Sequence, residues 1–179
     1  AAADLPRLVD NADLLMADDA EALLADLDSR SEALQFDIVI VTVDSLDGET
    51  PRNYAEDFFW YNNYGLGEDR DGVLLLLSMY DRSYSLYVRD GYAQSMIGSY
   101  AQQQLEDSFL DYLGDDDWYG SFHAYLTTCA DMMQQASEGH AVRKPLGKVI
   151  FPALLVGCGV ALAVCLVLKG KMKSVRRGA

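Results

Sequence analysis

The side chains of this chain best suited to chemistry are carboxylates in two short segments that also contain glycine. Glu68, Asp69 and Asp71 lie within four positions of one another, and Asp90 opens a turn further along the chain. Carboxylate oxygens are the ligands that hard cations such as Ca²⁺ and Mg²⁺ require. The four residues are therefore a candidate divalent-cation site, provided that the fold brings the two segments together.

A solvated acidic loop is the alternative interpretation of the same residues. The chain contains 28 Asp and Glu residues, all at or before Glu138, so neighbouring carboxylates are expected from composition alone. Acidic side chains are mostly exposed to solvent unless they are paired. The residue types by themselves leave the two interpretations evenly balanced.

Nothing in the sequence stands out as an arrangement for nucleophilic catalysis. The run DRDGV from Asp69 resembles the nucleophile motif of haloacid-dehalogenase phosphatases. That motif follows a buried strand and is accompanied by a lysine, whereas here it precedes a predicted strand and the first lysine is Lys144. His123 on a predicted helix and His140 in a predicted linker have no recognisable Ser or Cys partner. Cys129 is the only cysteine of the first 140 residues, which excludes a disulfide framework or zinc spacing there.

Hydrophobic periodicity predicts the elements that must position these residues, because helical spacing alternates with short apolar, β-branched runs. The predicted helices span about 18–34, 51–63, 98–113 and 118–136, and the predicted strands span 36–43, 72–79 and 83–90. Asp18 with Glu21 marks one helix start and Pro51 marks another. The acids at 115–117 are expected to cap the helix that begins at Trp118 rather than to form a site.

The order of these elements predicts an α/β fold. A strand, a helix and a second strand predict a parallel pair flanked by helices, and strand 83–90 is the expected hairpin partner of strand 72–79. The predicted architecture is a three-layer α/β/α sandwich with a small mixed sheet. Because strand 72–79 begins where strand 83–90 ends, the loop 65–71 and the turn at Asp90 are expected at the same end of the sheet.

Five stretches in chain order resemble the TPM domain family over nearly all of residues 5–136. They are LVDNADLL, FDIVIVTVDSLDGETPRNYAEDFF, GLGEDRDGVLLLL, DRSYSLYVRDGYA and DDDWYGSFHAYL. The positions that match the family motifs include Gly72 after the acidic loop and Gly91 with Tyr92 in the turn. One departure is Ala93, which replaces the last glycine of the family's Gly-Tyr-Gly. In another, Arg70 and Asp71 stand where the family has Asp-Asn.

Members of this family include thylakoid-lumen and photosystem II repair proteins, a nematode receptor accessory protein and many bacterial membrane proteins. The resemblance implies a bacterial, membrane-anchored member that binds a cation, often calcium. Its acidic site would include Asp10 in addition to Glu68, Asp69, Asp71 and Asp90. The resemblance also implies either the acid phosphatase activity claimed for some members or an accessory role without known chemistry.

Residues 149–168 form a run of 20 residues without a charge, about 30 Å long as a helix, which matches the hydrocarbon core of a bilayer. We predict a transmembrane helix here, joined to a domain at 1–138 by a basic linker at 139–148 and followed by a short basic cytoplasmic tail at 169–179. Three basic residues precede the run and five follow it, which favours an N-terminal domain outside the cytoplasm. The start at Ala-Ala-Ala without Met is expected after removal of a signal peptide.

Charge divides the chain at the same place. Residues 1–140 contain six Arg and no Lys against all 28 acids, a net charge of −22, whereas residues 141–179 carry +8. A nucleic-acid partner is unfavourable, because phosphate binding requires a basic stripe. A divalent cation or a basic protein partner suits the acidic part, and anionic lipid suits the basic tail.

Two functions from different classes follow from the sequence. The first is an accessory module of the cell envelope that presents a cation-dependent surface to another envelope protein. The second is a metal-assisted acid phosphatase in which the same carboxylates hold the ion. The absence of lysine favours the first function, because an acidic cleft repels phosphate.

Overall fold

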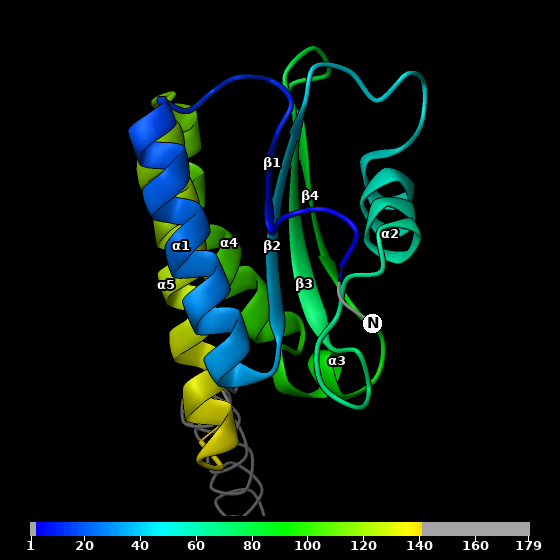
Figure 1. Ribbon diagram of the computed structural model, residues 1–179, viewed down its shortest axis with the longest axis vertical. Helices are drawn as coiled ribbons and strands as arrows, with labels where there is room; N and C mark the ends of the chain where they lie inside the picture. The colour runs from blue at the N-terminus through cyan, green and yellow to red at the C-terminus, as the bar shows by residue number, and fades with distance from the viewer. Residues whose placement is uncertain (1–2, 141–179) are drawn as a thin grey trace, which may run out of the picture. The chain divides into compact units, whose positions relative to one another are not determined.

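The computed structural model describes residues 3–140, which form a four-stranded sheet with helices on both faces (Figure 1). The strands are β1 (Leu8–Asp10), β2 (Asp37–Val43), β3 (Gly72–Ser78) and β4 (Ser83–Val88). The helices are α1 (Ala17–Leu34), α2 (Pro51–Tyr61), α3 (Tyr92–Met96), α4 (Ser99–Gly114) and α5 (Trp118–Ser137). The predicted α/β class is confirmed.

The sheet is mixed, with strand order β1-β2-β3-β4. Strands β1 and β3 both pair with β2 in parallel, and β4 pairs with β3 antiparallel. The predicted parallel pair and hairpin are therefore confirmed. Strand β1 and helix α3 were not predicted, because three and five residues are too few to produce a periodic hydrophobic signal.

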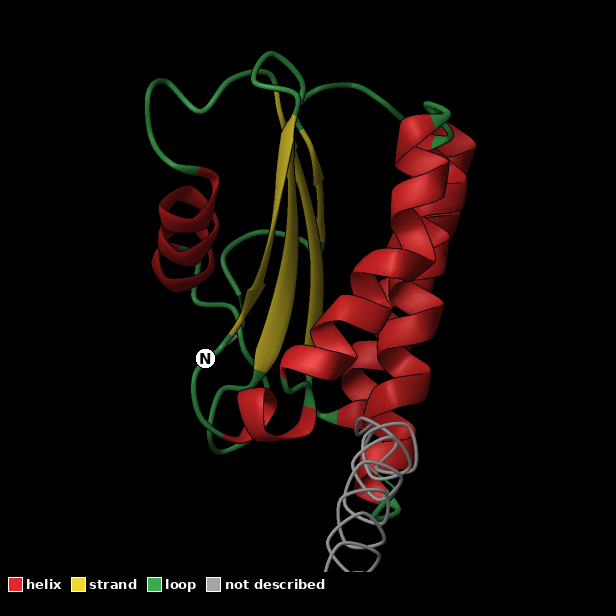
Figure 2. Ribbon diagram, turned by 180° about the vertical axis from the view of Figure 1, so that it is seen from behind, coloured by secondary structure: helices red, strands yellow, loops and turns green. Residues whose placement is uncertain are grey.

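Two hydrophobic cores form because side chains alternate between the faces of a strand. On β2, Ile38 and Ile40 pack into the larger core with side chains of α1, α4 and α5, whereas Val39 and Val41 pack into the smaller core. Phe59 of α2 is fully buried in the smaller core. Figure 2 shows the resulting layers, with α2 on one side of the strands and the other long helices on the other.

Local sequence signals explain where the helices begin. Thr50 caps α2 by accepting a hydrogen bond from the backbone N–H of Asn53, and Pro51 occupies the first turn. Asp117 caps α5 through a 2.9 Å bond from the N–H of Gly120, as predicted. Helix α1 begins at Ala17, so Asp18 lies inside the first turn rather than at the predicted cap position. There its negative charge interacts favourably with the positive end of the helix dipole.

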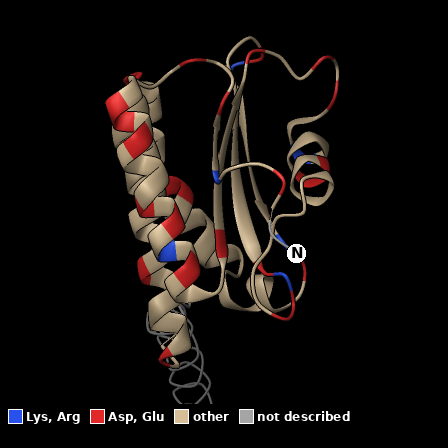
Figure 3. Cartoon of the chain, viewed as in Figure 1, with Lys and Arg blue, Asp and Glu red and all other residues tan. Residues whose placement is uncertain are grey.

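Asp and Glu residues are spread over both helices and loops (Figure 3). Arg and Lys are sparse in the same view, as expected for a domain with a net charge of −22. Among residues 3–140 there is no helix long and apolar enough to span a bilayer. The predicted transmembrane segment 149–168 lies outside the described residues.

Candidate functional site

The acidic loop 65–71 is a tight turn held by its own backbone. Leu66 and Asp71 exchange two backbone hydrogen bonds of 3.0 and 2.8 Å, so the loop closes on itself directly before β3. Gly65 has φ +111°, a conformation that residues with a side chain rarely adopt. A Cβ atom at Gly65 would also lie 2.3 Å from the carbonyl oxygen of Arg70. The glycine is therefore required for the loop to close.

Asp71 connects this loop to the turn that follows β4. Its carboxylate Oδ1 accepts a 3.0 Å hydrogen bond from the backbone N–H of Ala93, at the start of α3. The residue is buried, with 6% of its surface exposed. The predicted convergence of the loop 65–71 with the turn at Asp90 is thus confirmed at the level of the backbone.

The other three predicted site residues at this end of the sheet are exposed to solvent. Glu68 and Asp69 are exposed on the loop, and Asp90 is exposed in the turn. No group of three or more His, Cys, Asp or Glu side chains is placed to hold a metal ion anywhere in residues 3–140. The carboxylates are brought to one end of the sheet without forming a ready-made cage, and a cation site here stays a prediction.

The three family-motif residues shape the backbone at this end. Gly72 begins β3, where a Cβ atom would lie 2.9 Å from both the Asp37 carbonyl oxygen and the ring of Phe59. Gly91 has φ +118° and precedes α3, and the Tyr92 side chain is half exposed. The two glycines thus allow close packing and a sharp turn.

Asp10 lies at the opposite end of the sheet, so the structure does not bring it together with Asp71. Strand β1 runs parallel to β2, and Asp10 pairs with Thr42, whereas the start of β3 pairs with Asp37. Five residues of strand separate the two ends by about 16 Å. The Asp10 carboxylate is also occupied: it accepts hydrogen bonds from the Thr42 hydroxyl and from the N–H groups of Leu14 and Leu15.

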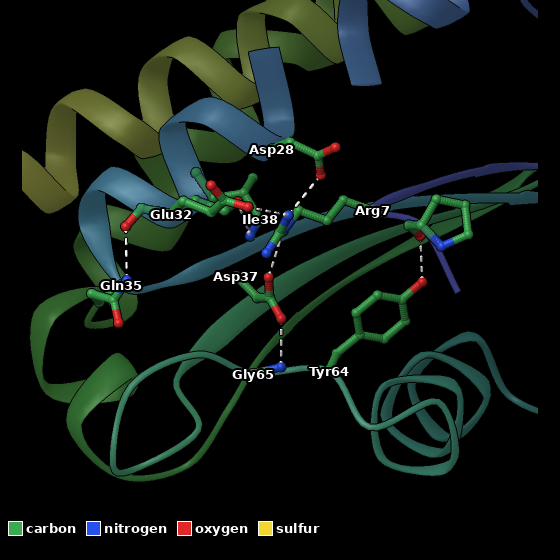
Figure 4. A network of polar contacts seen from close by, with 10 residues as sticks. Arg7, Asp28, Glu32, Gln35, Asp37, Ile38, Tyr64 and Gly65 are labelled. Atoms are coloured by element: carbon green, nitrogen blue, oxygen red, sulfur yellow. Dashed lines mark hydrogen bonds and ion pairs between the residues drawn. The ribbon is translucent and has the colours of Figure 1, made fainter. Parts of the chain in front are cut away.

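A partly buried ion-pair network beside the acidic loop was not predicted from the sequence (Figure 4). Arg7 donates from Nε to Asp37 at 2.7 Å and from Nη1 to Asp28 at 2.6 Å. The second oxygen of Asp37 accepts a 2.6 Å bond from the N–H of Gly65. Asp37 therefore links the N-terminal segment to the first residue of the loop.

Electrostatics favour the charged form of Arg7 in this network. Burial lowers the pKa of Arg7, but the hydrogen bonds and charges of Asp28 and Asp37 outweigh burial, and the net pKa is raised. The Asp37 side chain is only 3% exposed. The one available signal in the sequence is a carboxylate at the head of an otherwise apolar strand, since buried charges are normally paired.

A mixed sheet of this order, covered on both faces and carrying a tight acidic loop before β3, defines a particular kind of α/β domain. The family model described as the TPM domain matches residues 8–132, well over half of the chain. The chain belongs to the TPM domain family. Among curated proteins, none matches the sequence.

Three solution structures share the fold. The N-terminal domain of a protein from P. gingivalis aligns with a TM-score of 0.63 at 14% identity, covering 79% of this chain and 90% of that chain. The BA42 protein of Bizionia argentinensis gives 0.60 at 11% identity, covering 68% and 82%. The N-terminal domain of the cg2496 protein from Corynebacterium glutamicum gives 0.56 at 18%, covering 70% and 78%. At these identities the similarity establishes the fold alone.

Proposed function

We propose that this chain is a membrane-tethered TPM domain outside the cytoplasm that binds a divalent cation, Ca²⁺ or Mg²⁺, and acts as an accessory module for envelope proteins. The observation that carries the proposal is the Asp71 to Ala93 hydrogen bond. It ties the loop bearing Glu68 and Asp69 to the turn bearing Asp90. Four carboxylates at one end of the sheet repel one another, and a bound cation would relieve that repulsion.

The tether is supported by the sequence beyond the described domain. The uncharged run 149–168 has the length of a membrane span, and the more basic flank follows it. Residues 3–140 supply two hydrophobic cores of their own. Such a domain can fold at the end of a tether without help from the membrane.

Binding rather than hydrolysis is favoured by the charges of the domain. Residues 1–140 contain no lysine, and the guanidinium of Arg70, within the loop, donates a hydrogen bond to the carbonyl oxygen of Tyr64. A phosphate group would meet carboxylates without a lysine to balance its charge. A metal-assisted phosphatase is the alternative function, and the experiment below distinguishes the two.

Calcium should raise the melting temperature of residues 1–140. For a site with a Kd of about 1 mM, 10 mM CaCl₂ stabilises the fold by about 1.4 kcal/mol, or about 3–8 °C. The comparison is with 30 mM NaCl, which has the same ionic strength and reports general screening. The Asp69→Asn/Asp71→Asn variant should lose the calcium increment, since Asn keeps a hydrogen-bond acceptor for Ala93 but not the charge.

The matched control is Asp115→Asn/Asp116→Asn, which removes two exposed acids outside the proposed site and should keep the increment. If all three proteins respond alike, the loop is a solvated acidic surface. Hydrolysis of p-nitrophenyl phosphate that disappears in the loop variant would favour the phosphatase instead.

The tether is tested separately. Protease added to intact cells should remove the domain and leave a membrane fragment. Full protection of the domain would contradict the proposed orientation.

A further inference from the structure

Within residues 3–140, strand β4 lies at the edge of the sheet and pairs with β3 alone. The N–H of Arg89 bonds the carbonyl oxygen of Gly72 at 3.1 Å, which fixes the hydrogen-bonding pattern of the antiparallel pair. Because facing residues alternate between bonded and non-bonded pairs, Ser83, Ser85 and Tyr87 bond to β3. The N–H and C=O groups of the alternate residues Tyr84, Leu86 and Val88 point away from the sheet.

The three outward-facing amides lie in a polar groove. Its volume is about 450 Å³, and its floor includes five consecutive residues of β4, from Tyr84 to Val88. One wall is made by Arg52 and Glu56 of α2, and the other by Gln102 and Glu106 of α4. None of the three outward N–H groups has a hydrogen-bond partner in the part of the chain that the structure describes. The groove therefore presents the edge of a strand between two walls of polar side chains.

The charge of the groove is acidic. Its charged lining residues are Glu56, Asp90 and Glu106 against Arg52 alone. Burial, together with the charge of neighbouring Asp107, raises the pKa of Glu106, so a cation beside this carboxylate would be favourable. The surrounding domain has a net charge of −22. Electrostatic complementarity selects a basic occupant.

We propose that the β4 groove binds an extended basic segment of another protein, which adds to the sheet as a fifth strand. The backbone of the segment bonds the outward groups of Tyr84, Leu86 and Val88. Neighbouring side chains of a strand point to opposite faces, so two adjacent lysines would reach the two walls, one toward Glu56 and the other toward Glu106. The proposal rests on the interaction role proposed above, but it does not depend on the cation site.

A second copy of this chain is the competing occupant, because two exposed edges can pair with each other. Such pairing would place Glu56, Asp90 and Glu106 of one copy against the same acids of the other. It would also bring together two domains that each carry −22. Like charges in contact are unfavourable, and this argues for a basic peptide over self-association.

The probe is a fluorescein-labelled peptide, Thr-Val-Thr-Lys-Lys-Thr-Val-Thr, titrated against residues 1–140 in 150 mM NaCl and followed by anisotropy. A Glu56→Lys/Glu106→Lys variant should weaken binding at least tenfold. The matched control, Asp57→Lys/Asp111→Lys, makes the same change in charge on the same two helices outside the groove and should stay within threefold. A peptide with the same lysines but proline at both Val positions should bind at least tenfold more weakly, because proline has no amide N–H to donate and is poorly tolerated in a paired strand.

Amide hydrogen exchange gives a readout that does not depend on the variants. Saturating peptide should slow exchange at Tyr84, Leu86 and Val88 at least tenfold and leave Ser85 and Tyr87, which already bond to β3, unchanged. Absence of binding, equal losses in the two charge variants, or unaltered outward amides would overturn the proposal. Protection of the same amides without peptide that grows with protein concentration would assign the edge to self-association instead. The titration is repeated in EDTA, so that a failed cation site and a failed groove give different results.

Discussion

Asp37 connects segments that are far apart in the sequence at the acidic end of the sheet. Its two carboxylate oxygens bond Arg7, 30 positions earlier, and Gly65, 28 positions later. One side chain thus joins the N-terminal segment, the start of β2 and the acidic loop. A carboxylate this deeply buried is tolerated because both of its oxygens are satisfied, one of them by a guanidinium.

Asp37→Ala should destabilise the domain by about 3–5 kcal/mol, as expected when one partner of a buried ion pair is removed and a buried N–H loses its acceptor. Asp28→Ala is the control. It removes the other partner of Arg7, but its side chain is 46% exposed, so its expected cost is below about 1 kcal/mol. Urea unfolding of residues 1–140 measures both. Equal losses in the two variants would mean that the two buried bonds of Asp37 contribute no more than the exposed ion pair of Asp28.

At the scale of elements, each long helix and strand follows from a sequence signal spread over many residues. The apolar run of β3 and the Thr50-Pro51 start of α2 are local, and both were predictable. The pairing of Arg7 with Asp37 was not, because nothing in a local pattern encodes a contact across 30 positions. The analogy that placed Asp10 near the acidic loop carried no strand direction, and the parallel β1 puts it at the other end.

The cap of α5 provides a test at this scale. Asp117→Ala should cost about 1 kcal/mol, because the N–H of Gly120 loses its acceptor and the helix start loses a favourable charge. Asp115→Ala should change stability by less than about 0.5 kcal/mol, since its exposed carboxylate makes no hydrogen bond or ion pair within residues 3–140. Thermal unfolding of both variants measures the difference. A similar loss in each would mean that the hydrogen bond from Gly120 contributes nothing to stability.

The stability of the whole domain should depend on alkaline pH through its core. Burial raises the pKa of the Cys129 thiol on α5, and burial also raises the pKa of Tyr125. An unfolded Cys ionises near pH 8.5, so its contribution is fully present below about pH 8.5 and is lost as pH rises toward the folded pKa. Tyr125 adds to the loss only above about pH 10.

The free energy of unfolding of residues 1–140 should therefore fall by about 1 kcal/mol between pH 8.5 and pH 9.5, with Cys129 as the main cause. Cys129→Ala should be less stable at pH 7.5 but should lose this dependence on pH. Urea unfolding at pH 7.5, 8.5 and 9.5 gives the comparison. An undiminished slope in the variant would assign the alkaline sensitivity to another group.

Helix α5 sets the time at which the domain can fold during its synthesis. Tyr125 bonds the carbonyl oxygen of Val39, 86 positions earlier, and α5 supplies much of the larger core. A nascent chain that has emerged only to Asp117 has all four strands but lacks α5. One apolar face of β2 and β3 is then exposed to water. At 5–20 residues per second, the missing helix takes about 1–4 s to be made. The nascent chain must therefore carry a sheet with one uncovered face for that interval.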